Sequence, residues 1–198
     1  MNEHFVRFYE NEASLAAQVS SFIGAGLEHD DACIVIATQP HRDAIERQLR
    51  MHGWTADAAD CLMLDAAETL SLLTVDNWPQ EAAVTDLFKK LVGDASQGGS
   101  RHVRIFGEMV AILVEASNED AAIRLEDLWN RLSEPYSISL LCAYPIQTVI
   151  SGHCRSLIRI CAEHTGVALP DSLWTSAYLG TAPWQAAHGT APMALGAD

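Results

Sequence analysis

The sequence has few basic residues, and this excludes two classes of partner. Only 12 of its 198 residues are lysine or arginine, and no basic run is longer than Lys89-Lys90. A nucleic-acid-binding protein needs a basic patch, and the formal net charge of −14 repels both duplex DNA and anionic membranes. We therefore expect no direct nucleic-acid binding and no membrane association.

Long apolar runs and paired cysteines are also lacking. No apolar run reaches the roughly 18 residues that span a bilayer. Residues 1–4 contain no basic segment that leads into an apolar one, as a signal peptide would. The five cysteines are odd in number and include no CxxC pair, which is typical of free, buried thiols in a reducing compartment. We therefore expect a cytoplasmic protein.

The common catalytic and metal-binding motifs are missing as well. There is no HExxH or HxxxH pair, no GxSxG turn, and no Gly-Lys pair of the kind found in a phosphate-binding loop. The eight histidines are scattered along the chain. We therefore expect no metal, no cofactor and no catalytic residues, and a Walker-type ATPase is excluded.

What the sequence does contain is a regular alternation of two apolar patterns. Short apolar runs predict strands at residues 4–9, 32–38, 61–64, 102–106 and 139–144. Helical spacing predicts helices at 12–28, 40–51, 65–75, 109–115 and 118–132, one around 84–92, and a closing one from 150 to about 166. Strands that alternate with helices, with little sign of hairpins, predict an α/β fold with a mainly parallel sheet and helices on both faces.

The composition changes near Leu179 to alanine, glycine, threonine and proline. Such a segment has too few large apolar groups to offset the entropy cost of ordering it. We therefore expect residues 1–178 to form a single domain and residues 179–198 to form a flexible tail that folding does not need.

Six sequence blocks carry a family resemblance, in the order HFVRFYEN, FIGAGLEHDDACIVIAT, LDAAETL, FGEMVAIL, LEDLWNRL and SLLCAYP. Over about residues 4–164 the chain resembles the MEDS family, the methanogen and methylotroph sensory domain of a dichloromethane-responsive regulator. The resemblance implies a RecA/KaiC-like fold, here without a phosphate-binding loop. It also implies a stand-alone sensor of small, hydrocarbon-derived compounds.

The resemblance further implies a partner. Members of the family occur alone, beside DNA-binding domains or beside histidine kinases. This chain has no helix-turn-helix segment and no kinase core, so a histidine kinase or a transcription regulator must carry the output. A homo-oligomer is also compatible with the sequence.

The predicted ligand site lies where the strands end, because ligands of open α/β sheets bind at the carboxyl ends of the strands. Glu108 follows one buried strand and is predicted either to bind a ligand or to hold a neighbouring loop. Tyr144 ends another strand, and Trp129 and Asn130 lie on a nearby helix, where Trp129 is favoured as a core residue. An apolar pocket with a few polar groups would result.

A helix start at Pro40 could attract an anion beside the same edge, although the interpretation of its first-turn residues as solvated ones is favoured. The predicted ligand-binding residues are Thr38, His41, Arg42, Glu108, Trp129, Asn130 and Tyr144. His4 is interpreted as a strand-end residue, and it should face away from Tyr9 because the two have opposite parity along their strand.

Three functions remain open. The first is a small-molecule sensor that acts through a signalling partner, which is favoured. The second is a ligand-free protein-interaction module of a two-component or transcriptional regulatory system. The third is an enzyme that uses Glu108 or Cys142 in an unrecognised reaction. An open pocket at the sheet edge would favour the first, and a packed edge with an exposed apolar patch the second.

Overall fold

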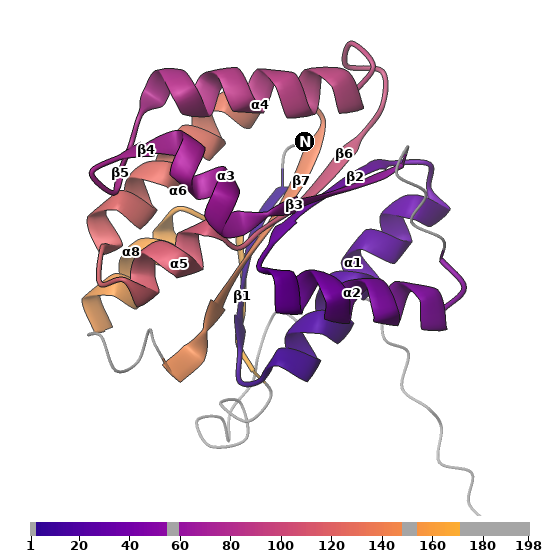
Figure 1. Ribbon diagram of the computed structural model, residues 1–198, viewed down its shortest axis with the longest axis horizontal. Helices are drawn as coiled ribbons and strands as arrows, with labels where there is room; N and C mark the ends of the chain where they lie inside the picture. Colours follow the sequence, from indigo (N-terminus) through magenta and orange to yellow (C-terminus); the bar gives the residue numbers. More distant parts are fainter. Residues whose placement is uncertain (1–2, 55–59, 148–153, 171–198) are drawn as a thin grey trace, which may run out of the picture.

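A six-stranded sheet forms the centre of the protein, and every strand in it runs parallel to its neighbours (Figure 1). The computed structural model describes residues 3–54, 60–147 and 154–170. The strand order is β3-β2-β6-β7-β1-β8. The strands are β1 (Glu3–Tyr9), β2 (Ala32–Ala37), β3 (Cys61–Asp65), β6 (Val103–Gly107), β7 (Ile138–Pro145) and β8 (Gly166–Ala168). The predicted α/β class is therefore confirmed.

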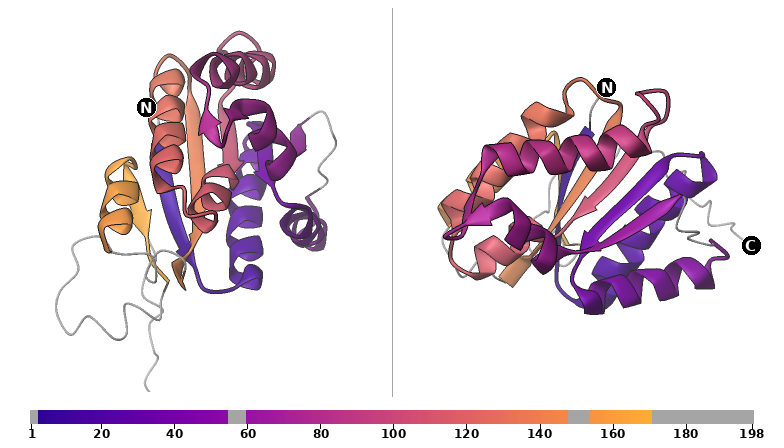
Figure 2. Two further views of the ribbon diagram at one scale, coloured as in Figure 1. Left: turned by 60° about the vertical axis from the view of Figure 1, so that its left-hand side comes forward. Right: turned by 45° about the horizontal axis from the view of Figure 1, so that its top comes forward.

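Helices cover both faces of this sheet, as the sequence predicted (Figure 2). One face is covered by α1 (Glu12–Glu28) and α2 (Gln39–Met51). The other is covered by α3 (Ala66–Leu73), α4 (Glu81–Ala95), α5 (Met109–Glu115), α6 (Glu119–Ser133) and α8 (Cys154–Ala162). The unequal layers give two apolar cores of different size.

The alternation of side chains along each strand explains why both layers form. In β2, Ile34 and Ile36 belong to the core beneath α3–α6, whereas Val35 belongs to the core beneath α1 and α2. Because successive side chains of a strand point to opposite faces, a continuous apolar run supplies both cores at once. All six residues of β2 are buried, as this explanation requires.

Side chains at the helix starts fix where two of the helices, α1 and α3, begin. Asn11 accepts a hydrogen bond from the backbone N–H of Ser14 at 2.9 Å, which starts α1. Asp65 accepts one from the N–H of Glu68 at 2.9 Å, which starts α3 and confirms the predicted cap. Each cap satisfies a backbone donor that would otherwise lack a partner at the helix end.

One short hairpin corrects the sequence prediction. The helix that was expected to reach Val75 ends at Leu73, and β4 (Thr74–Val75) then pairs antiparallel with β5 (Trp78–Pro79). Asp76 and Asn77 form the turn with φ of 50° and 57°. Aspartate and asparagine tolerate this left-handed conformation, which two-residue hairpin turns require, and the spacing argument overlooked that signal.

The C-terminal elements also differ from the prediction, because here too a short strand follows a helix that ends earlier than predicted. The closing helix was expected to end near Gly166, but α8 ends at Ala162, and β8 follows as an edge strand beside β1. Three residues are too few to give an alternating pattern. The start of the predicted helix, at Ile150, and the predicted tail at 179–198 lie outside the described residues. Among the described helices, none is both long enough and apolar enough to cross a membrane.

Two helical glycines give a test of how closely α1 packs on the sheet. A Cβ atom at Gly26 would lie 2.6 Å from the Cδ of Arg104 and 2.9 Å from the Sγ of Cys33, whereas one at Gly93 in α4 would meet nothing within 4 Å. We expect Gly93→Ala to raise the free energy of unfolding by about 0.5–1 kcal/mol, because alanine restricts the unfolded chain. We expect Gly26→Ala to lower it by about 1–3 kcal/mol through overpacking.

Urea denaturation of both variants beside the wild type measures these changes. An increase in stability for Gly26→Ala equal to that for Gly93→Ala would contradict the close approach of α1 to β2 and β6.

Candidate functional site

Four of the predicted site residues meet at the carboxyl ends of β2 and β6. Glu108 follows β6, and its carboxylate accepts a hydrogen bond from the backbone N–H of Thr38 at 2.8 Å. Its other oxygen accepts a hydrogen bond from the Nδ1 of His41, in the first turn of α2. Glu108 is 4 % exposed, so this carboxylate is satisfied by the protein rather than by water. These contacts hold the start of α2 to the end of β6.

Arg42 belongs to the same group and is held on three sides. Its guanidinium donates to the carbonyl of Ala37 at 3.0 Å and to the carboxylate of Asp65 at 2.8 Å, and it also contacts Gln39. Hydrogen bonds from the backbone N–H of Glu68 and from Arg42 lower the pKa of Asp65. The side chains of this group therefore bind one another. The carboxylate of Glu108 lies beside the start of α2, where an anion would approach this helix.

The other three predicted residues lie on the opposite face of the sheet. Trp129 is 5 % exposed and packs edge-on against Phe88 with ring centroids 5.2 Å apart, so its interpretation as a core residue is confirmed. The Tyr144 hydroxyl donates to a carboxylate at 2.7 Å, but this carboxylate belongs to Glu126 and not to Glu108. The expected grouping of Tyr144 and Asn130 with Glu108 is therefore wrong, because alternation along β7 directs Tyr144 toward α6.

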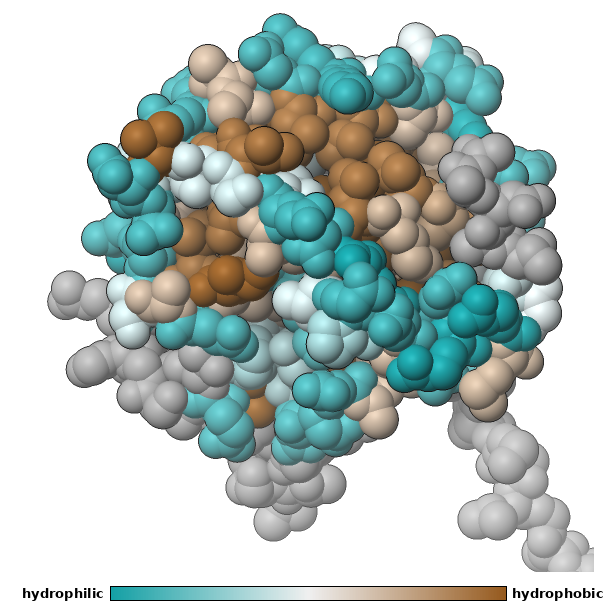
Figure 3. Space-filling model, viewed as in Figure 1, coloured by the Kyte–Doolittle hydropathy of each residue, from teal (hydrophilic) through white to brown (hydrophobic). Residues whose placement is uncertain are grey.

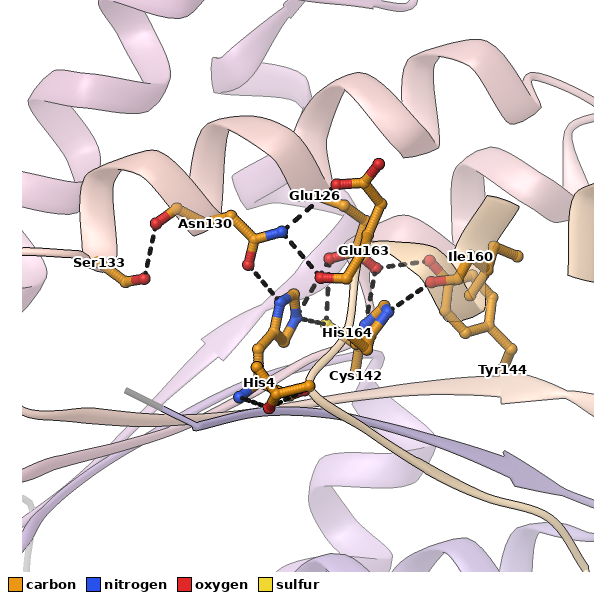
Figure 4. A network of polar contacts seen from close by, with 10 residues as sticks. His4, Glu126, Asn130, Ser133, Cys142, Tyr144, Ile160, Glu163 and His164 are labelled. Carbon is orange, nitrogen blue, oxygen red and sulfur yellow. Dashed lines mark hydrogen bonds and ion pairs between the residues drawn. The ribbon is translucent and has the colours of Figure 1, made fainter. Parts of the chain in front are cut away.

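Glu126 is the centre of a buried polar cluster that we define as His4, Glu126, Cys142 and His164 (Figure 4). The Nε2 of His4 lies 3.3 Å from Glu126 Oε2 and 3.3 Å from the Sγ of Cys142. The Nε2 of His164 lies 3.4 Å from Glu126 Oε1. One potential ligand atom from each residue lies within 4.8 Å of those of the others. This combination of imidazole, thiol and carboxylate groups is able to hold a metal ion.

Four separate elements supply the cluster. His4 is in β1 and Cys142 is in β7. His4 pairs in register with Leu140, and Leu140 is two residues from Cys142, so both side chains lie on the face beneath α6. Glu126 projects from α6, and His164 lies between α8 and β8. His4 faces away from Tyr9 and lies at the start of β1, as predicted, but the prediction did not include its burial, at 5 % exposed, or the contacts of both its ring nitrogens.

The electrostatics of the cluster favour an ionised Glu126. Burial opposes ionisation of this carboxyl, but the adjacent imidazoles of His164 and His4 outweigh burial and lower its pKa. Burial and the nearby charge of Glu126 raise the pKa of both Cys142 and Tyr144. Both groups are therefore protonated at neutral pH and donate to the carboxylate, with Cys142 Sγ 3.5 Å from Glu126 Oε2.

An apolar hollow adjoins this cluster between the sheet and the layer of α5 and α6. Its empty volume is about 270 Å³ when the space open to solvent at its mouth is included. Cys142 belongs both to the wall of the hollow and to the polar cluster. The lining residues are Ile36, Ile105, Gly107, Met109, Val110, Trp129, Leu140 and Cys142.

Sequence reasoning missed Glu126 and His164. A signal existed for Glu126, because it lies four residues after Ala122 and three before Trp129, and thus on the apolar stripe of its helix. A charged residue on such a stripe is almost always paired when it is buried. His164 carries no comparable signal, since its position depends on a strand that the sequence did not predict.

Comparison with known proteins gives one match. A family model described as the methanogen/methylotroph, DcmR sensory domain matches residues 3–160. No curated protein matches the chain. The matched range begins at β1 and extends into α8, so it contains the sheet-edge group, the hollow, and His4, Glu126 and Cys142.

The contact between His41 and Glu108 makes a prediction about pH. The hydrogen bond to Glu108 raises the pKa of His41 above 6.5 against the opposing effect of burial, with smaller contributions from Glu12 and Glu115. Because the folded pKa exceeds the unfolded one, the stabilisation is complete below about pH 6.5 and is lost as the pH rises through the raised pKa. We expect His41→Gln to lower the free energy of unfolding most at acidic pH and progressively less at alkaline pH.

Urea denaturation across this pH range measures the difference between variant and wild type. His52→Gln, at an exposed histidine just after α2, serves as the control for replacing a histidine outside this contact. A difference for His41→Gln that does not change with pH would sink the prediction.

Proposed function

Because this chain belongs to the MEDS family of sensory domains, we propose that it binds a small, hydrocarbon-derived molecule in the cytoplasm and acts through a partner protein. The described cysteine side chains, at 33, 61, 142 and 161, are all free thiols, which is the usual state in a reducing compartment. The proposal has three parts: the kind of ligand, the place where it binds, and the surface that contacts the partner protein.

The observation that carries the proposal is the apolar hollow beside Cys142. Its walls come from β2, β6 and β7 on one side and from α5 and α6 on the other. It lies toward the carboxyl ends of these strands, where open α/β sheets bind their ligands. Apart from the Cys142 thiol, the lining is apolar, and this favours an uncharged organic molecule.

Gly107 keeps this hollow open. It is in β6 with the same parity as Val103 and Ile105, whose side chains belong to the core beneath α5 and α6. A Cβ atom at Gly107 would meet nothing within 4 Å. The space that a larger residue would fill is therefore part of the hollow, and Gly107 is the residue whose replacement tests the site most directly.

The size of the hollow limits the ligand to a few heavy atoms. Apolar cavities of roughly 150 Å³ bind molecules such as benzene or xenon. The volume of about 270 Å³ includes space that is open to solvent, and the enclosed part has room for only about one water molecule. A molecule of the size of dichloromethane therefore enters only if the lining side chains move apart, and a nucleotide is too large.

Binding without catalysis is the favoured activity. Cys142 is the one nucleophile among the residues that line the hollow, and burial together with the charge of Glu126 raises its pKa. A thiol reacts as its thiolate, so these surroundings suppress its reactivity. At the sheet edge, Glu108 is bonded to Thr38 and His41 and is not free to act as a general base.

An interaction surface for a partner is supported by a separate observation. The apolar side chains of Leu72, Val75 and Trp78, in α3, β4 and β5, are 73 %, 60 % and 46 % exposed. Apolar residues gather on the face that carries α3 (Figure 3). Contiguous exposed apolar groups commonly mark protein contacts. Because of this surface, a protein-interaction module remains the alternative function. A variant whose hollow is blocked but which still signals would favour that alternative.

We expect dichloromethane to bind wild-type protein saturably and to shift the NMR signals of the Trp129 indole and of the methyl groups of Val110 and Leu140. Gly107→Val should abolish these shifts, because its side chain fills the hollow. ATP with magnesium should cause no shift in either protein, because the start of α2 is occupied by Glu108.

Gly93→Val is the matched control, since Gly93 lies in α4 away from the hollow and its surroundings are open. This variant should bind dichloromethane as the wild type does. Equal binding by Gly107→Val and wild type would place the ligand elsewhere, and the absence of saturable binding for a panel of small haloalkanes and alkanes would count against the sensory mechanism proposed here.

A further inference from the structure

The buried cluster of His4, Glu126, Cys142 and His164 brings together four side chains that can each bind a metal ion through one atom. Figure 4 shows the two imidazoles and the thiol gathered around the Glu126 carboxylate. The side chain of Glu126 and that of His164 are both 0 % exposed, and that of His4 is 7 % exposed. Water therefore does not separate these groups.

The outer contacts of the histidines fix which ring nitrogen faces inward. The amide nitrogen of Asn130 donates to the carbonyl of Glu163 at 2.8 Å, so its Oδ1 faces the Nδ1 of His4 at 2.7 Å and accepts that proton. The Nδ1 of His164 donates to the carbonyl of Ile160 at 2.6 Å. In the neutral form, which a metal ion requires, both histidines thus carry their proton on Nδ1 and present the Nε2 lone pair to the cluster. In the absence of a metal ion, the contact with Glu126 outweighs burial and raises the pKa of His164, which favours a second proton on this ring.

This is the arrangement that metal-binding histidines show. A ligating imidazole usually donates its second N–H to a carbonyl or carboxylate, which orients the ring and increases its basicity. Here a side-chain amide and a backbone carbonyl do so for His4 and His164. Tyr144 holds the carboxylate of Glu126 in the same manner, through its hydroxyl at 2.7 Å.

An unsatisfied nitrogen is a second, independent sign of a ligand. Although it lies 3.4 Å from Glu126, the Nε2 of His164 makes no hydrogen bond of ordinary geometry. Within the described ranges, it is one of two buried side-chain atoms of this kind, the other being Oε1 of Gln18. A buried polar atom without a partner is costly, and a bound cation would satisfy this one.

The distances suit a small tetrahedral ion. With metal–nitrogen and metal–oxygen bonds near 2.0–2.1 Å and metal–sulfur bonds near 2.3 Å, ligand atoms around a tetrahedral ion lie about 3.3–3.6 Å apart. From Glu126 Oε2, the Nε2 of His4 lies at 3.3 Å and the Sγ of Cys142 at 3.5 Å, and these two atoms lie 3.3 Å from each other. The Nε2 of His164 lies 3.4 Å from the other carboxylate oxygen, Oε1. The separations that exceed the tetrahedral range, up to 4.8 Å, must contract.

We propose that His4, Glu126, Cys142 and His164 bind one divalent transition-metal ion of the zinc class. Two imidazoles with a thiolate and a carboxylate are the donors that borderline ions such as Zn²⁺ prefer, whereas calcium and magnesium require oxygen ligands. On binding, the Cys142 thiol loses its proton to solvent and its sulfur bonds to the metal, so that each ion releases one proton from this residue.

The ion would fasten the C-terminal part of the domain to the sheet. His4 lies in β1, and His164 lies between α8 and β8, the edge strand that pairs with β1. Thr165 already donates to the carbonyl of His4 through its backbone N–H at 2.7 Å and through its hydroxyl at 2.9 Å. A metal bond from His164 would add to this short attachment, which gives metal a direct effect on the stability of α8 and β8.

Cobalt substitution tests the site, independently of any ligand in the hollow. The full chain is stripped with a chelator under reducing conditions and titrated with Co²⁺, whose tetrahedral thiolate complexes give intense visible bands and a thiolate-to-cobalt charge-transfer band. We expect saturation at one ion per chain, displacement by Zn²⁺, a higher Tm with Zn²⁺, and slower amide exchange in α8 and β8.

Matched cysteine variants identify the ligands. Cys142→Ser should lose the charge-transfer band, whereas Cys61→Ser should keep it, since Cys61 is an equally buried thiol in β3 at the other end of the sheet. Glu126→Gln, with its fold checked by circular dichroism, should weaken Co²⁺ binding at least tenfold. Protein that is folded yet gives no charge-transfer band and no rise in Tm would overturn the proposal, as would a band that persists in Cys142→Ser.

Discussion

The carboxylate of Glu126 has no access to water. Its need for hydrogen-bonding and charged partners constrains how the elements on one face of the sheet are placed. A buried charge is tolerated only when it is paired and hydrogen-bonded, and removing one partner of such a pair typically costs about 3–5 kcal/mol. The partners here come from β1, β7 and the segment between α8 and β8. Because Glu126 itself belongs to α6, these elements can satisfy it only in one relative position. The charge thus specifies how the C-terminal segment docks, which apolar contacts alone specify less sharply.

Glu108 places a second carboxylate on the opposite side of the sheet, and the two illustrate different uses of a buried acid. Glu108 accepts from the backbone of Thr38 and from His41, both at the start of α2. Its bonds are local to two adjacent strand ends and occupy the backbone N–H of Thr38 and the Nδ1 of His41. Glu126 collects groups that are up to 160 residues apart in sequence. Glu108 thus joins two neighbouring strand ends, whereas Glu126 joins elements from both ends of the domain's sequence.

The fold was largely predictable from sequence, because its strands and helices have apolar patterns that depend on local spacing. The limits of α1 and α5 were predicted to the residue, and the strand around Ile34 was recognised from its continuous apolar run. What failed depends on longer-range facts. The β4–β5 turn requires two residues with positive φ, and β8 exists only through its pairing with β1. The cluster could not be predicted for the same reason. The alternation along β1 places the side chains of His4 and Tyr9 on different faces of the sheet, but no local pattern indicates that His164 lies beside Glu126.

The shared position of Cys142 connects the apolar and polar parts of this face. Its side chain lies in the wall of the hollow, and its Sγ lies 3.3 Å from His4 and 3.5 Å from Glu126. Because protein interiors are close-packed, a molecule that enters the hollow must press on this wall and cannot leave Sγ unmoved. A displacement of a few tenths of an ångström there alters hydrogen bonds, or metal bonds, whose strength depends steeply on distance. The consequence reaches the edge strand β8 through His164, far along the chain from Gly107. Under the function proposed above, filling this small apolar space would change how firmly the C-terminal segment is held.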